Sequence, residues 1–155
     1  MLTIGSPAPD FSLFNQDKKE VSLSSLRGQN VLVHFFPLSF TGVCTDQLCY
    51  TRDHLQDYTD VQATVLAIST DSLFAQAEFR KQLNLPFDLL SDYNHQVIKD
   101  WGMEIAEFAF GMKGVSARGT YIIDKEGIVR YAERTANPGV LPNFDAIQQC
   151  LNGLK

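Results

Sequence analysis

Cys44 stands at a place in the sequence where a protein could use its thiol as a nucleophile. The segment PLSFTGVC, residues 37–44, directly follows the apolar run VLVHFF, residues 31–36. If Thr41 is the N-cap of a helix, Cys44 falls at the third helical position, where free backbone N–H groups and the helix dipole favour a negatively charged sulfur. The pattern therefore predicts a thiolate that can attack an electrophile.

The other cysteines indicate redox chemistry at thiols. The chain has three cysteines, and an odd number fits poorly with a purely structural set of disulfides. No Cys-x-x-Cys pair and no closely spaced pair of histidines accompanies Cys44, Cys49 and His54, so a metal site is not expected. We expect no cofactor.

Length, charge and hydropathy exclude several classes of protein. The 155 residues fit one compact domain, residues 1–155, and a net charge of -5 with scattered Lys and Arg gives no footprint for nucleic acid. The first residues lack the basic region of a signal peptide, and no apolar stretch is long enough to span a bilayer. Together with cysteines that suit a reducing compartment, these features predict a cytoplasmic protein with no membrane or nucleic-acid partner.

The elements that must position Cys44 alternate between strand and helix. Residues 31–36 and 63–69 have the β-branched and aromatic character of buried strands, and a helical pattern follows each of them. Such alternation predicts parallel strands with right-handed crossovers. The remaining expected elements are an N-terminal hairpin within residues 11–23, a second hairpin within 120–131, and a last helix that begins near Asn143. The predicted fold is an α/β, thioredoxin-like fold: a central mixed sheet flanked by helices, with an N-terminal β-hairpin.

Three segments resemble the peroxiredoxin family. Pro37, Thr41 and Cys44 reproduce the family's active-site signature, Pro-x-x-x-Thr-x-x-Cys, and residues 5–11 and 118–124 resemble two further stretches of its sequence. The resemblance extends over nearly the whole chain. It implies an enzyme that reduces hydroperoxides.

The same resemblance implies a role for each matching residue. Cys44 is the peroxidatic cysteine, Thr41 hydrogen-bonds the peroxide, Pro37 shields the sulfur, and Arg118 stabilises the thiolate and the transition state. One position differs, because many relatives have Glu three residues after the catalytic cysteine and this chain has Gln47. A glutamine can still form hydrogen bonds there.

Cys49 is the first candidate for the thiol that resolves the oxidised Cys44. The five-residue spacing resembles that of the Q-type peroxiredoxins, or bacterioferritin comigratory proteins, in which both cysteines lie in one helix. The resemblance implies an intramolecular disulfide that thioredoxin or a similar dithiol reduces. Five helical residues rise about 7.5 Å, beyond the roughly 7 Å limit between disulfide-linked Cα atoms, so we expect the helix to unwind locally. Cys150 is the competing candidate for the resolving thiol, but it is interpreted as a packing thiol in preference.

The leading hypothesis is a peroxidase that acts on hydrogen peroxide and organic hydroperoxides. One alternative is a one-cysteine peroxidase, related to the one-cysteine bacterial peroxiredoxins, in which an external thiol resolves Cys44 and Cys49 is a spectator. Another is a redox-sensing interaction protein that uses the same oxidation. A disulfide oxidoreductase is disfavoured because Cys-x-x-Cys is missing. The sequence leaves open whether the protein is a monomer or a homodimer.

Several other side chains have two interpretations. His34, in the middle of a buried strand, is interpreted as a hydrogen-bonded core histidine, in preference to a base or a ligand. Phe40 lines the peroxide entrance or packs within its loop. Trp101, Phe108 and Phe110 form packing contacts or an interface patch.

Overall fold

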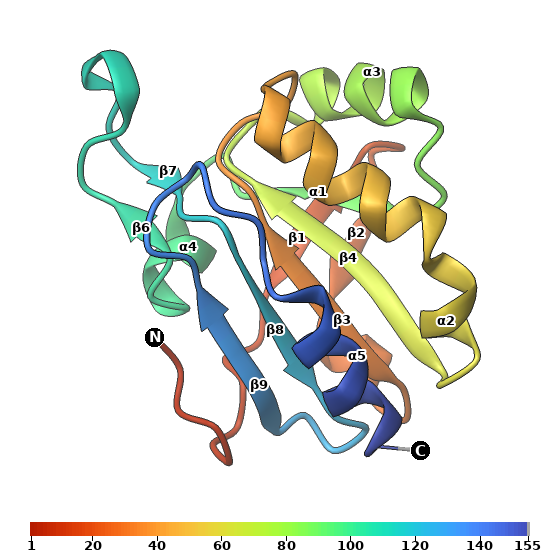
Figure 1. Ribbon diagram of the computed structural model, residues 1–155. Helices are drawn as coiled ribbons and strands as arrows, with labels where there is room; N and C mark the ends of the chain where they lie inside the picture. The colour runs from red at the N-terminus through yellow and green to blue at the C-terminus, as the bar shows by residue number, and fades with distance from the viewer. Residues whose placement is uncertain (155) are drawn as a thin grey trace.

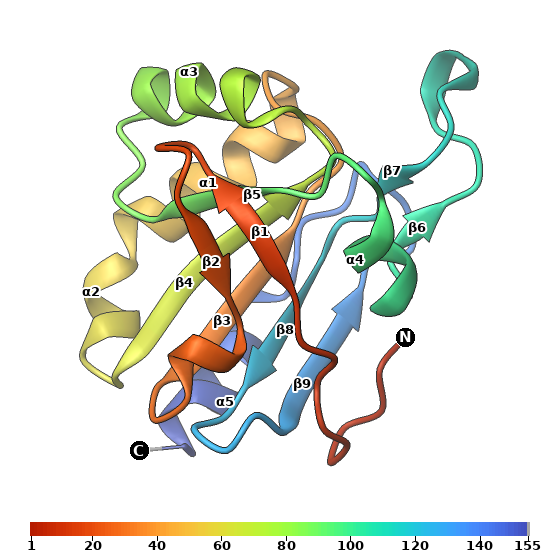
Figure 2. The same cartoon turned by 180° about the vertical axis from the view of Figure 1, so that it is seen from behind.

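A mixed β-sheet organises the computed structural model, which describes residues 1–154 (Figures 1 and 2). Within these residues the main sheet has seven strands in the order β2-β1-β5-β4-β3-β8-β9, and β6 and β7 form a separate pair. The strands are β1 (Ser12–Asn15), β2 (Glu20–Ser22), β3 (Asn30–Phe35), β4 (Ala63–Ser69), β5 (Asp88–Ser91), β6 (Glu104–Ile105), β7 (Val115–Ser116), β8 (Gly119–Ile123) and β9 (Val129–Arg134).

Among the strands in residues 1–154, parallel pairing is confined to the middle of the main sheet. Strand β3 pairs with β4, and β4 with β5, in parallel. The contacts β1–β2, β1–β5, β3–β8 and β8–β9 are antiparallel. The mixed sheet, the N-terminal hairpin β1–β2 and the later hairpin β8–β9 confirm the thioredoxin-like arrangement predicted from the sequence.

Helices cover both faces of this sheet. They are α1 (Gly42–Asp53), α2 (Leu55–Thr59), α3 (Leu73–Leu83), α4 (Gln96–Asp100) and α5 (Phe144–Asn152), and the short 3₁₀ turns are η1 (Ser24–Leu26) and η2 (Ala109–Gly111). Helices α1, α2, α3 and α5 pack through one apolar cluster, whereas α4 and the N-terminal segment pack through another on the opposite face. None of the helices in the described residues combines the length and apolarity needed to cross a membrane.

The alternation of side chains along β3 decides which residues face α1. Val31, Val33 and Phe35 belong to the cluster that contains α4, whereas Leu32 belongs to the cluster beneath α1. By the two-residue period of a strand, His34 lies on the same side as Leu32, beneath α1. A polar side chain is therefore buried between the sheet and the helix that carries Cys44.

Some elements differ from the expectation. The single helix expected after residues 31–36 is interrupted at His54, whose φ of -110° and ψ of 14° separate α1 from α2. Strand β5, helix α4 and the β6–β7 pair were not predicted. Each has five residues or fewer, which is too short to show a clear period.

Candidate active site

The loop after β3 brings Cys44 to the first turn of α1. Thr41 is the N-cap of this helix, with φ -100° and ψ 153°, so Cys44 occupies the third helical position as predicted. The Thr41 hydroxyl donates to the carbonyl oxygen of Leu38 at 2.8 Å and does not cap the helix. Cys44 itself is fully buried, and Pro37, at the start of the same loop, is also buried.

Asp71, just after the end of the neighbouring strand β4, fixes the loop that precedes α1. Its Oδ2 accepts hydrogen bonds from the backbone N–H and the hydroxyl of Ser39 at 2.8 and 2.9 Å, and from the Ser69 hydroxyl at 2.7 Å. Phe40 next to Ser39 has a φ of 65° and packs against Phe79, with ring centroids 5.1 Å apart. These contacts hold the turn that leads into α1, while the Phe40 side chain remains 51% exposed.

Arg118 comes from the opposite side of the site, just before β8, and is 2% exposed. Its guanidinium donates from Nη2 to Cys44 Sγ at 3.2 Å, from Nη1 to Gln47 Oε1 at 2.8 Å, and from Nε to the Pro138 carbonyl oxygen at 2.9 Å. The structure thus brings together Cys44 and Arg118, which are 74 residues apart in the chain.

The charge on this buried guanidinium needs compensation. No ion pair joins Arg118 to a carboxylate within residues 1–154, where the observed ion pairs involve Arg52, Lys99 and Arg130. An arginine stays protonated in proteins, and a buried charge is costly unless an opposite charge pairs with it. The only anion that the contacts of Arg118 can supply is a Cys44 thiolate.

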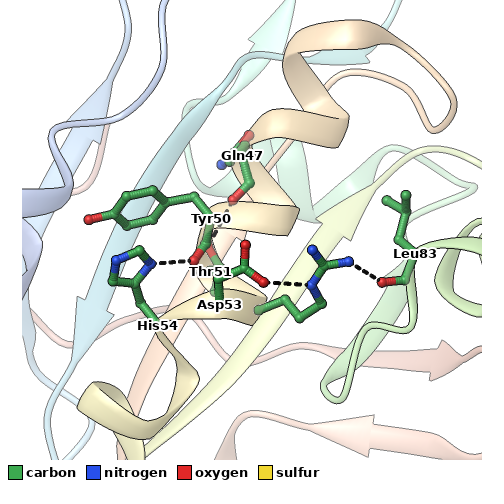
Figure 3. Close-up of polar contacts among 7 residues, drawn as sticks. Gln47, Tyr50, Thr51, Asp53, His54 and Leu83 are labelled. Atoms are coloured by element: carbon green, nitrogen blue, oxygen red, sulfur yellow. Dashed lines mark hydrogen bonds and ion pairs between the residues drawn. The ribbon is translucent and has the colours of Figure 1, made fainter.

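Gln47 extends the site into the space between α1 and the sheet. Its Nε2 lies 3.4 Å from the carbonyl oxygen of Phe35 and 3.3 Å from His34 Nδ1. One turn later on α1, the hydroxyl of Thr51 donates to the backbone carbonyl oxygen of Gln47 at 2.9 Å (Figure 3). The prediction that Gln47 would still form hydrogen bonds is therefore confirmed.

The far end of α1 is tied to another helix. Arg52 donates from Nη1 to the carbonyl oxygen of Leu83, the last residue of α3, at 2.6 Å (Figure 3). The ring nitrogen Nδ1 of His54 lies 2.9 Å from the backbone carbonyl oxygen of Tyr50, where the helix ends. These contacts anchor the C-terminal half of α1 independently of Cys44.

The other two cysteines lie in different surroundings. Cys49 is half-buried on α1, and Cys150 is half-buried on α5, where its thiol donates to the Arg130 carbonyl oxygen at 3.7 Å. Burial raises the pKa of the Cys150 thiol. All three cysteines are free thiols, and the described residues contain no cluster of three or more His, Cys, Asp or Glu side chains that could hold a metal.

A groove of about 510 Å³ borders the site next to Arg118. Ile105, Phe108, Ala117 and Pro138 are among the residues that line it. Cys44 is not among them, so the groove adjoins the arginine and not the sulfur.

Several contacts that support this site could not be predicted from the sequence. Asp71, Pro138 and the pairing of Gln47 with Arg118 depend on contacts between segments far apart in the chain. For Gln47 one signal was available, because a residue three positions after Cys44 lies on the same side of the helix. Nothing local indicated the other two.

Comparison with known proteins places this arrangement in a family. Residues 4–132 match the AhpC/TSA family. Peroxiredoxin Q, chloroplastic, from Oryza sativa subsp. japonica is 41% identical over 127 residues, which are 82% of this chain and 57% of the relative. Alkyl hydroperoxide reductase E from Mycobacterium tuberculosis is 38% identical over 138 residues, or 86% of each chain. The match thus spans little more than half the length of the chloroplastic relative from rice.

Solved structures agree with the sequence comparison. The peroxidoxin BcpB from Mycobacterium tuberculosis has a TM-score of 0.88 at 25% identity, covering 100% of this chain and 99% of that one. A peroxiredoxin-like protein from Aquifex aeolicus has a TM-score of 0.89 at 26% identity, covering 99% and 88%. This chain belongs to the AhpC/TSA family, the family of the peroxiredoxins.

Proposed function

We propose that this chain is a thiol-dependent peroxidase that reduces hydrogen peroxide and organic hydroperoxides, with Cys44 as the nucleophile. The observation that carries the proposal is the buried Arg118 guanidinium, which lies 3.2 Å from Cys44 Sγ and has no carboxylate partner in residues 1–154. This cation stabilises a thiolate before the reaction and the developing negative charge during it.

In the first step, the Cys44 thiolate attacks the terminal oxygen of the hydroperoxide. A sulfur–oxygen bond forms as the O–O bond breaks, sulfur is oxidised by two electrons, and Cys44 becomes a sulfenic acid. The departing oxygen leaves as alkoxide or hydroxide and takes a proton from water, giving an alcohol or water. Arg118 remains protonated throughout, so it stabilises charge on sulfur and then on the departing oxygen.

Thr41 and Pro37 prepare the peroxide for this attack. Because the Thr41 hydroxyl gives its proton to Leu38 O, its oxygen is left as an acceptor for the O–H of a hydroperoxide. That hydrogen bond orients the peroxide toward Cys44. The buried Pro37 ring limits the access of water to the sulfur.

In the second step, the Cys49 thiol attacks the sulfenic acid, and a Cys44–Cys49 disulfide forms with loss of water. Both residues lie in α1, and five helical residues separate their Cα atoms by about 7.5 Å, with side chains roughly 140° apart. A disulfide needs less than about 7 Å. The N-terminal half of α1 therefore unwinds, while the bond from Arg52 to Leu83 retains its C-terminal end.

An external dithiol such as thioredoxin then reduces the disulfide and restores α1. The three free thiols suit a reducing compartment such as the cytoplasm. The chain acts as one domain, residues 1–155, in a monomer or a homodimer.

Replacement of the two cysteines tests the proposal. Cys44→Ser removes the nucleophile, so peroxide consumption in the presence of thioredoxin, thioredoxin reductase and NADPH falls to the level without enzyme. Cys150→Ser serves as the matched control and keeps its turnover. Turnover retained in Cys44→Ser contradicts the proposal.

Cys49→Ala tests the resolving step separately. The first oxidation of Cys44 continues at the normal rate, because Cys49 takes part only afterwards, but cycling through thioredoxin stops. Normal cycling in this variant supports the one-cysteine mechanism, in which an external thiol resolves Cys44.

A further inference from the structure

A chain of polar side chains leads from the sulfur into the core between β3, β8 and α1. It runs from Cys44 through Arg118 and Gln47 to His34, which is fully buried in the middle of β3. His34 pairs across the sheet with Thr120 of β8, and its Nδ1 lies 2.9 Å from the Thr120 hydroxyl. His34 takes no part in the peroxidase mechanism proposed above.

The contacts of His34 determine where its proton lies. The Thr51 hydroxyl has one hydrogen and donates it to the backbone carbonyl oxygen of Gln47. Toward His34 Nε2, at 3.0 Å, the Thr51 oxygen can therefore only accept. Nε2 must therefore carry the proton. Burial lowers the pKa of His34 to about 3, so the ring is neutral and Nδ1 is an acceptor, with the Thr120 hydroxyl at 2.9 Å and the Gln47 amide nitrogen at 3.3 Å as its donors.

The lone pair on Nδ1 orients the Gln47 side chain. The amide nitrogen has two hydrogens, and His34 Nδ1 and the Phe35 carbonyl oxygen are two acceptors within 3.3 and 3.4 Å of it. This arrangement turns Oε1 toward Arg118 Nη1, at 2.8 Å. A flipped amide would put its N–H groups against the guanidinium and its oxygen against two acceptors, and every one of these contacts would be repulsive.

We infer that His34 is a positioning residue of the peroxidase site: its Nδ1 acceptor, together with the Phe35 carbonyl, holds Gln47 so that Arg118 stays in line with Cys44 Sγ. This role rests on the function proposed above. His34 does not touch the sulfur, and it acts through Gln47 and Arg118.

A neutral pair at these positions also preserves the charge that the reaction uses. The Gln47 amide orients Arg118 without neutralising it, whereas a carboxylate at position 47 would form an ion pair and compete with the thiolate for the guanidinium. A carboxylate would also face the Phe35 carbonyl and the lone pair of His34. Glutamine at 47 and neutral histidine at 34 are therefore chemically matched.

Two variants of His34 test this role by the rate at which peroxide oxidises Cys44. His34→Phe keeps a ring but removes the acceptor, and we expect oxidation about fivefold to tenfold slower, the loss of one aligning hydrogen bond. His34→Asn places an amide oxygen near the position of Nδ1 and restores most of that rate. If His34 had only a structural role, both variants would change the free energy of unfolding, but the oxidation rate would not fall in His34→Phe and recover in His34→Asn.

Thr120→Val is the matched control, because it removes the other partner of Nδ1 and leaves Gln47 untouched. We expect its oxidation rate to stay within about twofold of the unaltered protein, a change smaller than one hydrogen bond gives. Loss of rate in Thr120→Val equal to that in His34→Phe would attribute the effect to general disturbance of the core and overturn the role of His34.

The tautomer is measured on the unaltered reduced protein, whether or not His34→Phe folds. A long-range ¹H–¹⁵N spectrum is expected to show His34 protonated at Nε2 and unprotonated at Nδ1; a proton on Nδ1 overturns the inference. Fast oxidation of both the unaltered protein and His34→Phe rejects only the positioning role. Slow oxidation of the unaltered protein rejects the peroxidase function and this inference with it.

Discussion

Acid should destabilise this protein through His34 in a range where few other groups titrate. Burial lowers the pKa of His34 from 6.5 to about 3, so between these pH values His34 is protonated in the unfolded chain and neutral in the folded chain. Stability is therefore lost as the pH falls below about 6.5, and the loss continues down to about pH 3. Between pH 7 and pH 5 the linkage relation gives a decrease of about 2 kcal/mol in the free energy of unfolding from this one group.

Urea denaturation of the reduced protein measures this effect, with the fluorescence of the buried Trp101 as the signal. The comparison is with His34→Asn, which has no titrating ring. Burial acts to raise the pKa values of Asp10 and Asp124, but backbone and side-chain hydrogen bonds outweigh it and lower both below 3.8 in the folded protein. Both carboxyl groups are present in the two proteins, so their contributions to the pH dependence cancel in the difference. Equal pH dependence in the two proteins would refute the reasoning, because it would mean that folded His34 accepts a proton.

Three further predictions concern the site. Arg118→Lys keeps a positive charge but loses the fork that contacts Cys44 and Gln47 together, so stopped-flow oxidation of Cys44 should slow by at least about tenfold. Thr41→Val removes the acceptor for the peroxide and should slow oxidation about fivefold, whereas Thr41→Ser should keep most of the rate. Cys150→Ala should leave thioredoxin-dependent turnover within about twofold of normal, because the half-buried thiol with a raised pKa supplies little thiolate; a larger loss would give Cys150 a part in catalysis.

The elements with strong local patterns could be predicted from the sequence. The apolar runs of β3 and β4, and the turn Lys125-Glu126-Gly127 between β8 and β9, carry their signal within a few residues. The N-cap at Thr41 follows from the residue types around the start of α1, so the helical position of Cys44 could also be predicted. Local chemistry decides these features, and the structure confirms them.

Elements that depend on their partners could not be predicted. Strand β5 has four residues, Asp88–Ser91, and it forms because β1 and β4 lie on either side of it. The aromatic residues divide in the same way: Trp101 is fully buried, whereas Phe110 is 99% exposed, and their sequence neighbourhoods do not distinguish them.

The candidate site shows the same division. The signature residues Pro37, Thr41 and Cys44 are local, but the contact between Cys44 and Arg118 joins segments 74 residues apart. The interpretation of His34 as a hydrogen-bonded core histidine is confirmed by its contacts with Thr51 and Thr120. Its link to Arg118 through Gln47 depends on the packing of α1 against β3, which no short stretch of sequence contains.

Oxidation of Cys44 by a hydroperoxide tests the central claim most directly. The reduced protein is mixed with hydrogen peroxide or an organic hydroperoxide in a stopped-flow instrument, and mass spectrometry then identifies the pairing of the thiols. We expect oxidation far faster than that of a free thiol, ending in a Cys44–Cys49 linkage. Oxidation no faster than that of a free thiol would contradict the peroxidase account and favour a redox-sensing protein that uses the same cysteine.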